Sequence, residues 1–206
     1  MEAPKSVKIQ VLAVSQPSAY GQPFLPGTKM ELDRIQSHTG AIPFTRVDGI
    51  GLTIQGVKDG LKEHSWVHFA CHAIQDSSKP IESSLLLGQN SRLTLAEITK
   101  LSLPHAEFAF LSACQTATGD EALREEAVHL AAGMLFAGYR GVIATMWSIL
   151  DSDAPLVADS VYAHLFKDAN PDPAQAAKAL HLAVHKLRNI QGKSFFSWVP
   201  FIHLGV

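Results

Sequence analysis

Short apolar runs alternate with longer, more polar segments along the whole chain. The runs are rich in Val, Ile, Ala and Phe, which is typical of strands buried in a sheet. They predict strands at residues 7–14, 66–70, 107–113 and 140–147, with a weaker candidate at 43–49. The segments between them have the apolar spacing and the capping residues of helices. They predict helices near 30–37, 53–64, 121–139, 153–167 and 173–190.

Strands that alternate with helices predict a three-layer α/β sandwich, α-β-α, with a mostly parallel sheet. Residues 83–95 form a small extended excursion, after which Thr94 is expected to cap a helical turn that contains Glu97. The tail at 194–206 is too apolar for a free end, so we expect it to pack back on the sheet. Neither a repeat nor a long linker divides the chain, and residues 1–206 are predicted to form a single domain.

Composition excludes several classes of function. Of the 206 residues, 47% are apolar and 17% are charged, which is typical of a well-packed globular domain. The formal net charge of −2 gives no general attraction to nucleic acid or to an anionic membrane. No apolar run is long enough to span a bilayer, and the two cysteines do not make a disulfide framework. We therefore expect a cytoplasmic protein in reducing surroundings.

Two of the predicted strands lead into reactive side chains. The segment WVHFACHA (66–73) contains His72, and EFAFLSACQTATGD (107–120) contains Cys114. Because the carboxyl ends of parallel strands meet at one edge of a sheet, these residues are expected to lie close together. A thiol beside an imidazole is a nucleophile beside its base, and the backbone N–H groups of Cys114 and Ala73 would then hold the oxyanion. Taken singly, each residue has a structural alternative: a buried Cys, or a His with a satisfied hydrogen bond.

Other histidines and cysteines allow a metal site to be considered. Side chains alternate along a strand, so His68 and His72 are expected on one face and Cys71 on the other. A zinc site formed by these three residues and Cys114 is conceivable, but the spacing matches neither a CxxC pattern nor an HxxxH pattern on a helix. The HLAVH segment (181–185) lacks the Glu of a metalloprotease helix. Phosphate-binding loops and a serine-hydrolase elbow are also absent, and we expect neither a metal nor an organic cofactor.

Residues after the last predicted strand are candidates for a substrate pocket. Trp147 could form one wall, and the backbone beyond it could pair with an extended peptide. Asp120 and Asp151 could supply negative charge for a basic side chain. An alternative is that these acidic residues, like their neighbours Glu121, Glu125, Glu126 and Asp153, stabilise the first turns of helices. The second interpretation is favoured for most of them.

These residues resemble the CHAT domain, a caspase-like cysteine peptidase family related to separases and caspases. The resemblance covers nearly the whole chain, and its most specific parts are the segments HFACHA and FLSACQTATGD; the other matching parts are LPGTKMELDRIQ, SSLLL, LTLAEI, EEAVHLAAGMLFAGYRGVIATMWSILDSDA and SWVPFIHLG. It implies a caspase–haemoglobinase-like fold and a catalytic dyad of His72 and Cys114. It also implies cleavage of peptide bonds in protein substrates without a cofactor.

The resemblance leaves two functions open. Members of the family usually have Gly directly after the His, whereas this chain has Ala73. If that position required positive φ, Ala73 would cost about 1 kcal/mol or more in strain. The chain is therefore expected to be a cysteine endopeptidase or, alternatively, a caspase-like scaffold without activity. Regulatory helical-repeat modules are expected partners if the chain, which begins with Met1, is part of a longer protein.

Overall fold

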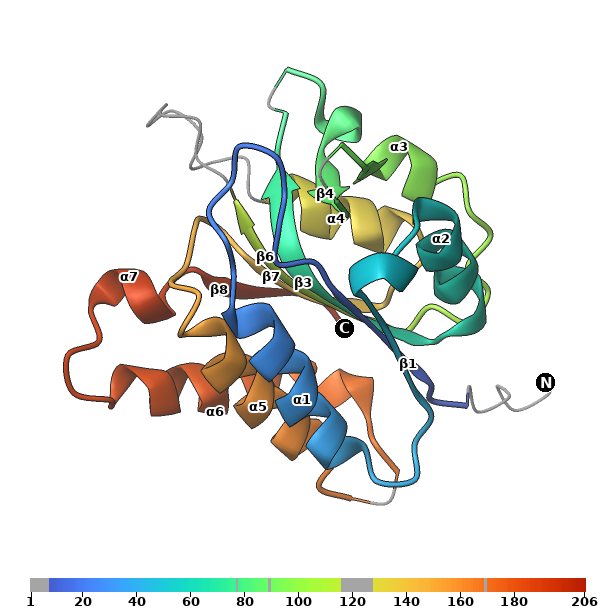
Figure 1. Cartoon of the computed structure of the whole chain (residues 1–206). Coiled ribbons are helices and arrows are strands. Elements are labelled where there is room, and N and C mark those ends of the chain that lie inside the picture. The colour runs from blue at the N-terminus through green and yellow to red at the C-terminus, as the bar shows by residue number, and fades with distance from the viewer. Residues whose placement is uncertain (1–7, 77, 89, 116–127, 169) are drawn as a thin grey trace.

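A computed structural model shows one mixed sheet between two layers of helices (Figure 1). It describes residues 8–76, 78–88, 90–115, 128–168 and 170–206, with the side chains of residues 50, 113–115, 128 and 129 outside the described part. The central sheet has the strand order β2-β1-β3-β6-β7-β8. The bounds of these strands are β1 Val11–Ser15, β2 Phe44–Asp48, β3 Trp66–Ile74, β6 Phe108–Gln115, β7 Gly141–Thr145 and β8 Phe201–Gly205.

The sheet is parallel from β2 through β7, as the alternating pattern predicts. β8 pairs antiparallel with β7, so the apolar tail does return to the sheet. A short hairpin of β4 (Ser84–Leu86) and β5 (Arg92–Thr94) is the predicted excursion, and it pairs antiparallel with the end of β3. This hairpin begins where β1 stops: β1 pairs with β3 as far as Ala70, and β4 pairs from His72 onward.

Helices cover both faces of the sheet (Figure 1). α2, α3 and α4 lie on one face, and α1, α5 and α6 lie on the other. The bounds of the helices are α1 Gly27–Thr39, α2 Ile54–Glu63, α3 Leu95–Ile98, α4 Val128–Phe136, α5 Ala154–Leu165, α6 Ala176–Arg188 and α7 Phe195–Trp198. Each face of the sheet has its own apolar core, and alternate residues of a strand belong to different cores. Val67, Phe69 and Cys71 of β3 pack into the core on the α2–α4 side. Trp66, Phe108 and Phe110 pack into the α1–α5–α6 side.

Local sequence accounts for several helix ends. The Thr53 hydroxyl accepts a hydrogen bond from the Gly56 N–H at 3.0 Å and begins α2. Thr94 and Glu97 form the predicted capping box at the start of α3. Gly138, just beyond α4, has a φ of +115°, which suits glycine and ends the helix.

Two predicted boundaries differ from the structure. β3 does not end at residue 70 but continues to Ile74, because the β4 hairpin supplies a new pairing partner there. The helix predicted at 121–139 is α4, which ends at Phe136; residues 121–127 lie outside the described part. No helix among the described residues has the length and apolar character needed to cross a membrane.

Candidate active site

The register between β3 and β6 brings the two predicted reactive positions together. His72 and Cys114 are Cα partners on these neighbouring parallel strands. Residues paired in this way occupy the same face of a sheet. Phe108 and Phe110 on β6 pack into the α1–α5–α6 core, so position 114 falls on that face too. The side chain of Cys114 lies outside the described part, and its backbone register is what the structure gives.

His72 is held by a loop at the carboxyl end of the sheet. Its side chain is only 2% exposed, and Nε2 lies 2.8 Å from the carbonyl oxygen of Pro23. A carbonyl oxygen only accepts hydrogen bonds, so Nε2 carries the proton and donates it. Nδ1 is buried and has no hydrogen-bond partner among the described residues. In the neutral imidazole, Nδ1 is therefore the nitrogen with a free lone pair.

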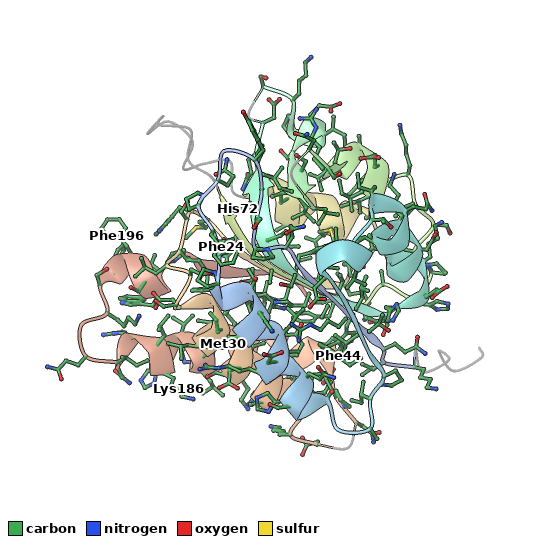
Figure 2. All side chains as sticks on the ribbon, viewed as in Figure 1. Phe24, Met30, Phe44, His72, Lys186 and Phe196 are labelled. Atoms are coloured by element: carbon green, nitrogen blue, oxygen red, sulfur yellow. The ribbon has the colours of Figure 1, made fainter. Side chains whose placement is uncertain are left out.

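The loop that carries Pro23 crosses from β1 to α1 (Figure 1), and both of its ends are tied down. At its start, the Gln16 N–H donates to the carbonyl oxygen of Ala70 at 2.9 Å. At its end, the Gly27 N–H donates to Oδ2 of Asp151 at 2.7 Å. Figure 2 shows Phe24, the residue after Pro23, on this loop together with His72 on β3. The tautomer of His72 thus depends on a segment far from it in sequence.

His68 lies beneath the site and is part of the core. Its Nδ1 is 3.3 Å from the Tyr162 hydroxyl, and its Nε2 is 3.1 Å from the Glu31 carboxylate, an ion-pair distance without hydrogen-bond geometry. All three side chains are buried. Burial, together with the negative charge of Glu31, raises the pKa of Tyr162 well above its usual range. His68 is therefore a residue of the core, and its contacts with Tyr162 and Glu31 are structural.

The residues considered for zinc do not converge. Cys71 packs into the core on the α2–α4 side of the sheet, whereas His68 contacts α1 and α5 on the other side, as the strand period predicts. Within the described ranges, no group of three or more His, Cys, Asp or Glu side chains is arranged to hold a metal ion. His181 and His185 are exposed on α6, which fits the interpretation of a solvated helix face.

Ala73 adopts an ordinary extended conformation. It lies within β3 between Leu85 of β4 and Gln115 of β6, and its side chain is 1% exposed in the core. Among the described residues, positive φ occurs only at glycines. The strain considered for an Ala at this position therefore does not arise, and the methyl group is buried with other apolar side chains. Whether its N–H serves as an oxyanion donor stays a prediction.

The predicted pocket residues are separated. Trp147 lines a hollow of about 320 Å³ together with Ser148, Phe195 and Phe196. Asp151 caps α1 through its contact with Gly27, and not α5, the helix that follows it and that the sequence predicts it to stabilise. Asp120 lies outside the described residues, as do Glu121, Glu125 and Glu126. The nearby Asp153 is fully buried and forms an ion pair with Lys193.

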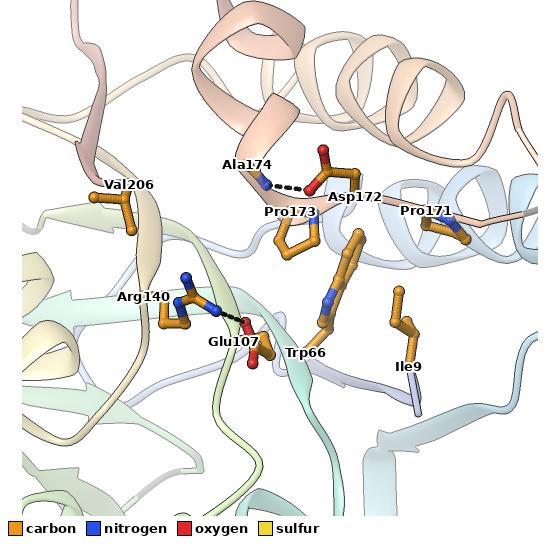
Figure 3. Close-up of a pocket in the computed structure, with 9 residues that line it drawn as sticks. All are labelled: Ile9, Trp66, Glu107, Arg140, Pro171, Asp172, Pro173, Ala174 and Val206. Carbon is orange, nitrogen blue, oxygen red and sulfur yellow. Dashed lines mark hydrogen bonds and ion pairs between the residues drawn. The ribbon is translucent and has the colours of Figure 1, made fainter. Parts of the chain in front are cut away.

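A second cavity lies at the opposite end of the strands (Figure 3). Its volume is about 270 Å³, and its lining includes Trp66, the first residue of β3, and Arg140, which directly precedes β7. Arg140 and Glu107 form a long ion pair of 3.5 Å across one wall. In parallel sheets, ligands bind at the carboxyl ends of the strands, and this cavity is at the amino ends. It is therefore separate from the site around His72.

Two contributions to the site were missed in the sequence. The carbonyl oxygen of Pro23 is a backbone group, and its contact with His72 spans 49 positions along the chain. Phe195 and Phe196 belong to the apolar tail. The apolar character of the tail predicts that it packs on the sheet, and does not show that these two side chains stay exposed. The turn-forming residues around Pro23 were the available signal, since they predict a loop leading from one strand end to a helix.

Comparisons with known proteins agree with this arrangement. A family model described as "CHAT domain" matches residues 1–206. The structure of the Porphyromonas gingivalis RgpB pro- and mature-domain complex is similar, with a TM-score of 0.56, 14% identity and coverage of 95% of this chain and 47% of that chain. The Arg-specific cysteine proteinase gingipain R (RGPB) gives a TM-score of 0.57, 15% identity and coverage of 95% and 46%.

These structural likenesses show the fold, which is the caspase–haemoglobinase-like arrangement of a mostly parallel sheet between helices. The chain spans less than half the length of either gingipain chain. No curated protein matches the chain. The family and the fold thus support a caspase-like cysteine peptidase frame around the paired positions of His72 and Cys114.

Proposed function

The chain belongs to the CHAT domain family, and from that premise we propose that it is a cysteine-type endopeptidase acting on protein substrates. In this proposal Cys114 is the nucleophile and His72 is the general base and acid. The backbone N–H groups of Cys114 and Ala73 stabilise the oxyanion. No metal or organic cofactor takes part in the proposed chemistry.

The observation that carries the proposal is the Cα pairing of His72 with Cys114, combined with the Pro23 contact. The pairing brings the two backbone positions side by side at the carboxyl end of the sheet. The contact fixes the proton of the neutral imidazole on Nε2 and leaves Nδ1 able to accept another. A base needs a free lone pair near the group that it deprotonates, and this tautomer provides one.

The first half of the reaction forms an acyl-enzyme. The Cys114 thiol transfers its proton to Nδ1 of His72, and the thiolate sulfur attacks the peptide carbonyl carbon. The carbonyl π electrons move to oxygen, which the backbone N–H groups stabilise. The C–N bond then breaks, the leaving nitrogen takes the proton from Nδ1, and a thioester to Cys114 is left.

The second half restores the enzyme. His72 accepts a proton from a water molecule, and the hydroxide attacks the thioester carbonyl. The C–S bond breaks, the carboxyl product leaves, and the thiolate regains its proton from the imidazolium. Throughout both halves the Pro23 carbonyl accepts a hydrogen bond from Nε2, which favours the charged imidazolium once it forms.

Substrates in this proposal are protein segments bound in an extended form beside Trp147. One similar structure is a complex of mature and pro-domains, and regulation of this chain by an additional module is part of the proposal. Helical-repeat modules of a longer protein are the proposed partners, and the cytoplasm is the proposed location.

Cleavage of a peptide library tests the proposal directly. Purified protein is incubated with a library of defined peptides, and the products are identified by mass spectrometry. We expect new termini with the native chain, and none with Cys114→Ala or His72→Ala. Cys71→Ala serves as the matched control and should leave cleavage intact, because Cys71 packs on the other side of the sheet. Cleavage that survives in Cys114→Ala would overturn the assignment of the nucleophile.

A catalytically inactive scaffold is the competing function. Ala73 was the feature that favoured it, through the strain that an Ala would suffer at a position with positive φ. The structure has Ala73 in an extended strand with its methyl group buried, so that argument loses its basis. The peptide library separates the two functions, because a scaffold would produce no new termini even when the chain is properly folded.

A further inference from the structure

Large apolar side chains are exposed on α7 and on the loop that carries Pro23. Phe195 and Phe196 are 57% and 63% exposed, and Phe24, next to Pro23, is 64% exposed. Figure 2 labels Phe196 on α7 and Phe24 on the loop between β1 and α1. Burying such side chains is the ordinary result of folding, so the two neighbouring exposed phenylalanines of α7 indicate a surface that binds a ligand.

The hollow between Trp147, Phe195 and Phe196 is held in place by its surroundings. The Met146 N–H donates to the carbonyl oxygen of Pro200 at 2.8 Å, which ties the segment of Trp147 to the segment after α7. Before α7, Lys193 forms its ion pair with the buried Asp153. These contacts fix the segments that carry the aromatic walls.

Further contacts brace α7 itself. The Arg188 guanidinium lies 5.3 Å from the centre of the Trp198 ring, a cation–π distance. The Phe195 and Trp198 rings meet edge to face, with their centroids 5.4 Å apart. α7 is thus attached to α6 through Arg188 and is well placed to present a fixed apolar surface.

The register of the sheet relates this hollow to the nucleophile. β6 and β7 are paired from Phe108↔Gly141 to Phe110↔Ile143, and β6 continues beyond this pairing to Gln115. β7 ends at Thr145, so Trp147 lies two residues beyond its carboxyl end, and β7 is the neighbour of β6, the strand that carries position 114. The hollow therefore belongs to the carboxyl end of the sheet, on the β7 side of the nucleophile position.

We propose that this hollow is the subsite that selects a bulky apolar side chain of the substrate, an inference that rests on the proposed function. Its volume of about 320 Å³ is ample for an aromatic or leucine side chain, since a cavity of about 150 Å³ already binds benzene. The lining residues that the structure describes carry no charge, which favours an apolar side chain of the substrate over Lys or Asp.

Binding to the subsite can be measured without catalysis. The Cys114→Ala protein is labelled with ¹⁵N and titrated with N-acetyl-phenylalanine methylamide, and with the alanine compound as a comparison. The chain has three tryptophans, and Trp147→Phe identifies the indole signal of Trp147. We expect that signal to shift with the phenylalanine compound and not with the alanine compound. Equal shifts with both compounds, or none, would overturn the subsite.

Two variants control for the site of binding. Phe195→Ser combined with Phe196→Ser should abolish the shift, and both positions are exposed enough to tolerate serine. Phe136→Ser removes an 82% exposed phenylalanine from α4, on the other face of the sheet, and should leave the shift unchanged. A shift that persists in the double variant would refute the assignment of these walls.

Cleavage gives a separate measure in the native chain. Peptides with Phe or Leu in the subsite should be cleaved with a kcat/KM about 10- to 100-fold above that of the Ala peptides. Cleavage without this preference would refute the subsite and leave the peptidase standing. Selective binding by the Cys114→Ala protein, with no cleavage by the native chain, would refute the peptidase and leave the subsite standing.

Discussion

Replacing Asp151 with alanine should weaken the loop that positions His72. α1 begins after Pro26, which provides no side-chain cap, and the carboxylate of Asp151 supplies the missing acceptor from 124 positions away. The Gly27 N–H lies 2.7 Å from Oδ2 of Asp151, and a Cβ at Gly27 would lie 2.7 Å from that same oxygen. The contact therefore requires both the acid and the glycine.

The expected size follows from this one hydrogen bond. A bond to a charged group contributes about 1.5–3 kcal/mol, and a carboxylate at a helix N-terminus contributes about 0.3–1 kcal/mol when exposed. Asp151 is half-buried, so we expect the free energy of unfolding to fall by about 1–2 kcal/mol. For a domain of this size that corresponds to a decrease in Tm of about 2–8 °C. Asp151→Asn, which keeps an acceptor oxygen, should lose less.

The same variant tests whether Asp151 contacts the substrate. If it acts only through the Pro23 loop, kcat/KM should fall by one common factor, at most about 100-fold, for peptides with Lys, Leu or Gln before the cut. Thermal unfolding and steady-state cleavage are measured on the same preparations. A selective loss for Lys peptides, with an unchanged Tm, would refute the capping role and restore Asp151 as a specificity residue.

Three further predictions each concern a single residue, and each is measured by unfolding. Thr94→Ala removes the capping box of α3 and should cost about 1 kcal/mol, whereas an unchanged midpoint in urea would contradict that role. Gly205→Ala places a methyl group against the Arg140 carbonyl oxygen at a φ of +107°, so we expect a loss of about 2 kcal/mol or more and a clear drop in Tm. Burial lowers the pKa of His203 below its ordinary value of 6.5, so the unfolded chain binds its proton first and stability should fall as pH drops below 6.5. In His203→Gln this part of the pH dependence should disappear; an identical slope in both proteins would contradict it.

Much of the fold could be predicted because burial on both faces leaves a plain record in the sequence. Continuous apolar runs marked the central strands, and Thr94 marked a helix start through its cap. The opposite faces of His68 and Cys71 followed from the period of a strand. These features depend on neighbours within a few residues, which a single sequence displays.

Features that depend on distant partners were not predictable in the same way. β3 extends to Ile74 because a hairpin that begins ten residues later pairs with it. Pro23 meets His72 through a backbone oxygen, and no side-chain type announces such a contact. Asp151 is an acidic residue next to a predicted pocket, yet its carboxylate accepts a hydrogen bond from the Gly27 N–H at the start of α1. The sequence also does not distinguish an apolar tail that packs fully from one that leaves two phenylalanines exposed.

The rate of alkylation at Cys114 tests the central pairing most directly. Iodoacetamide labelling at pH 7 is followed by mass spectrometry, with the fully buried Cys71 as an internal reference. An unassisted thiol is only a few per cent thiolate at this pH, so we expect His72→Ala to slow labelling of Cys114 by about 10-fold or more, with Cys71 unreactive in both proteins. Equal labelling rates with and without the imidazole would show that the two residues do not act together, and would contradict the proposed dyad.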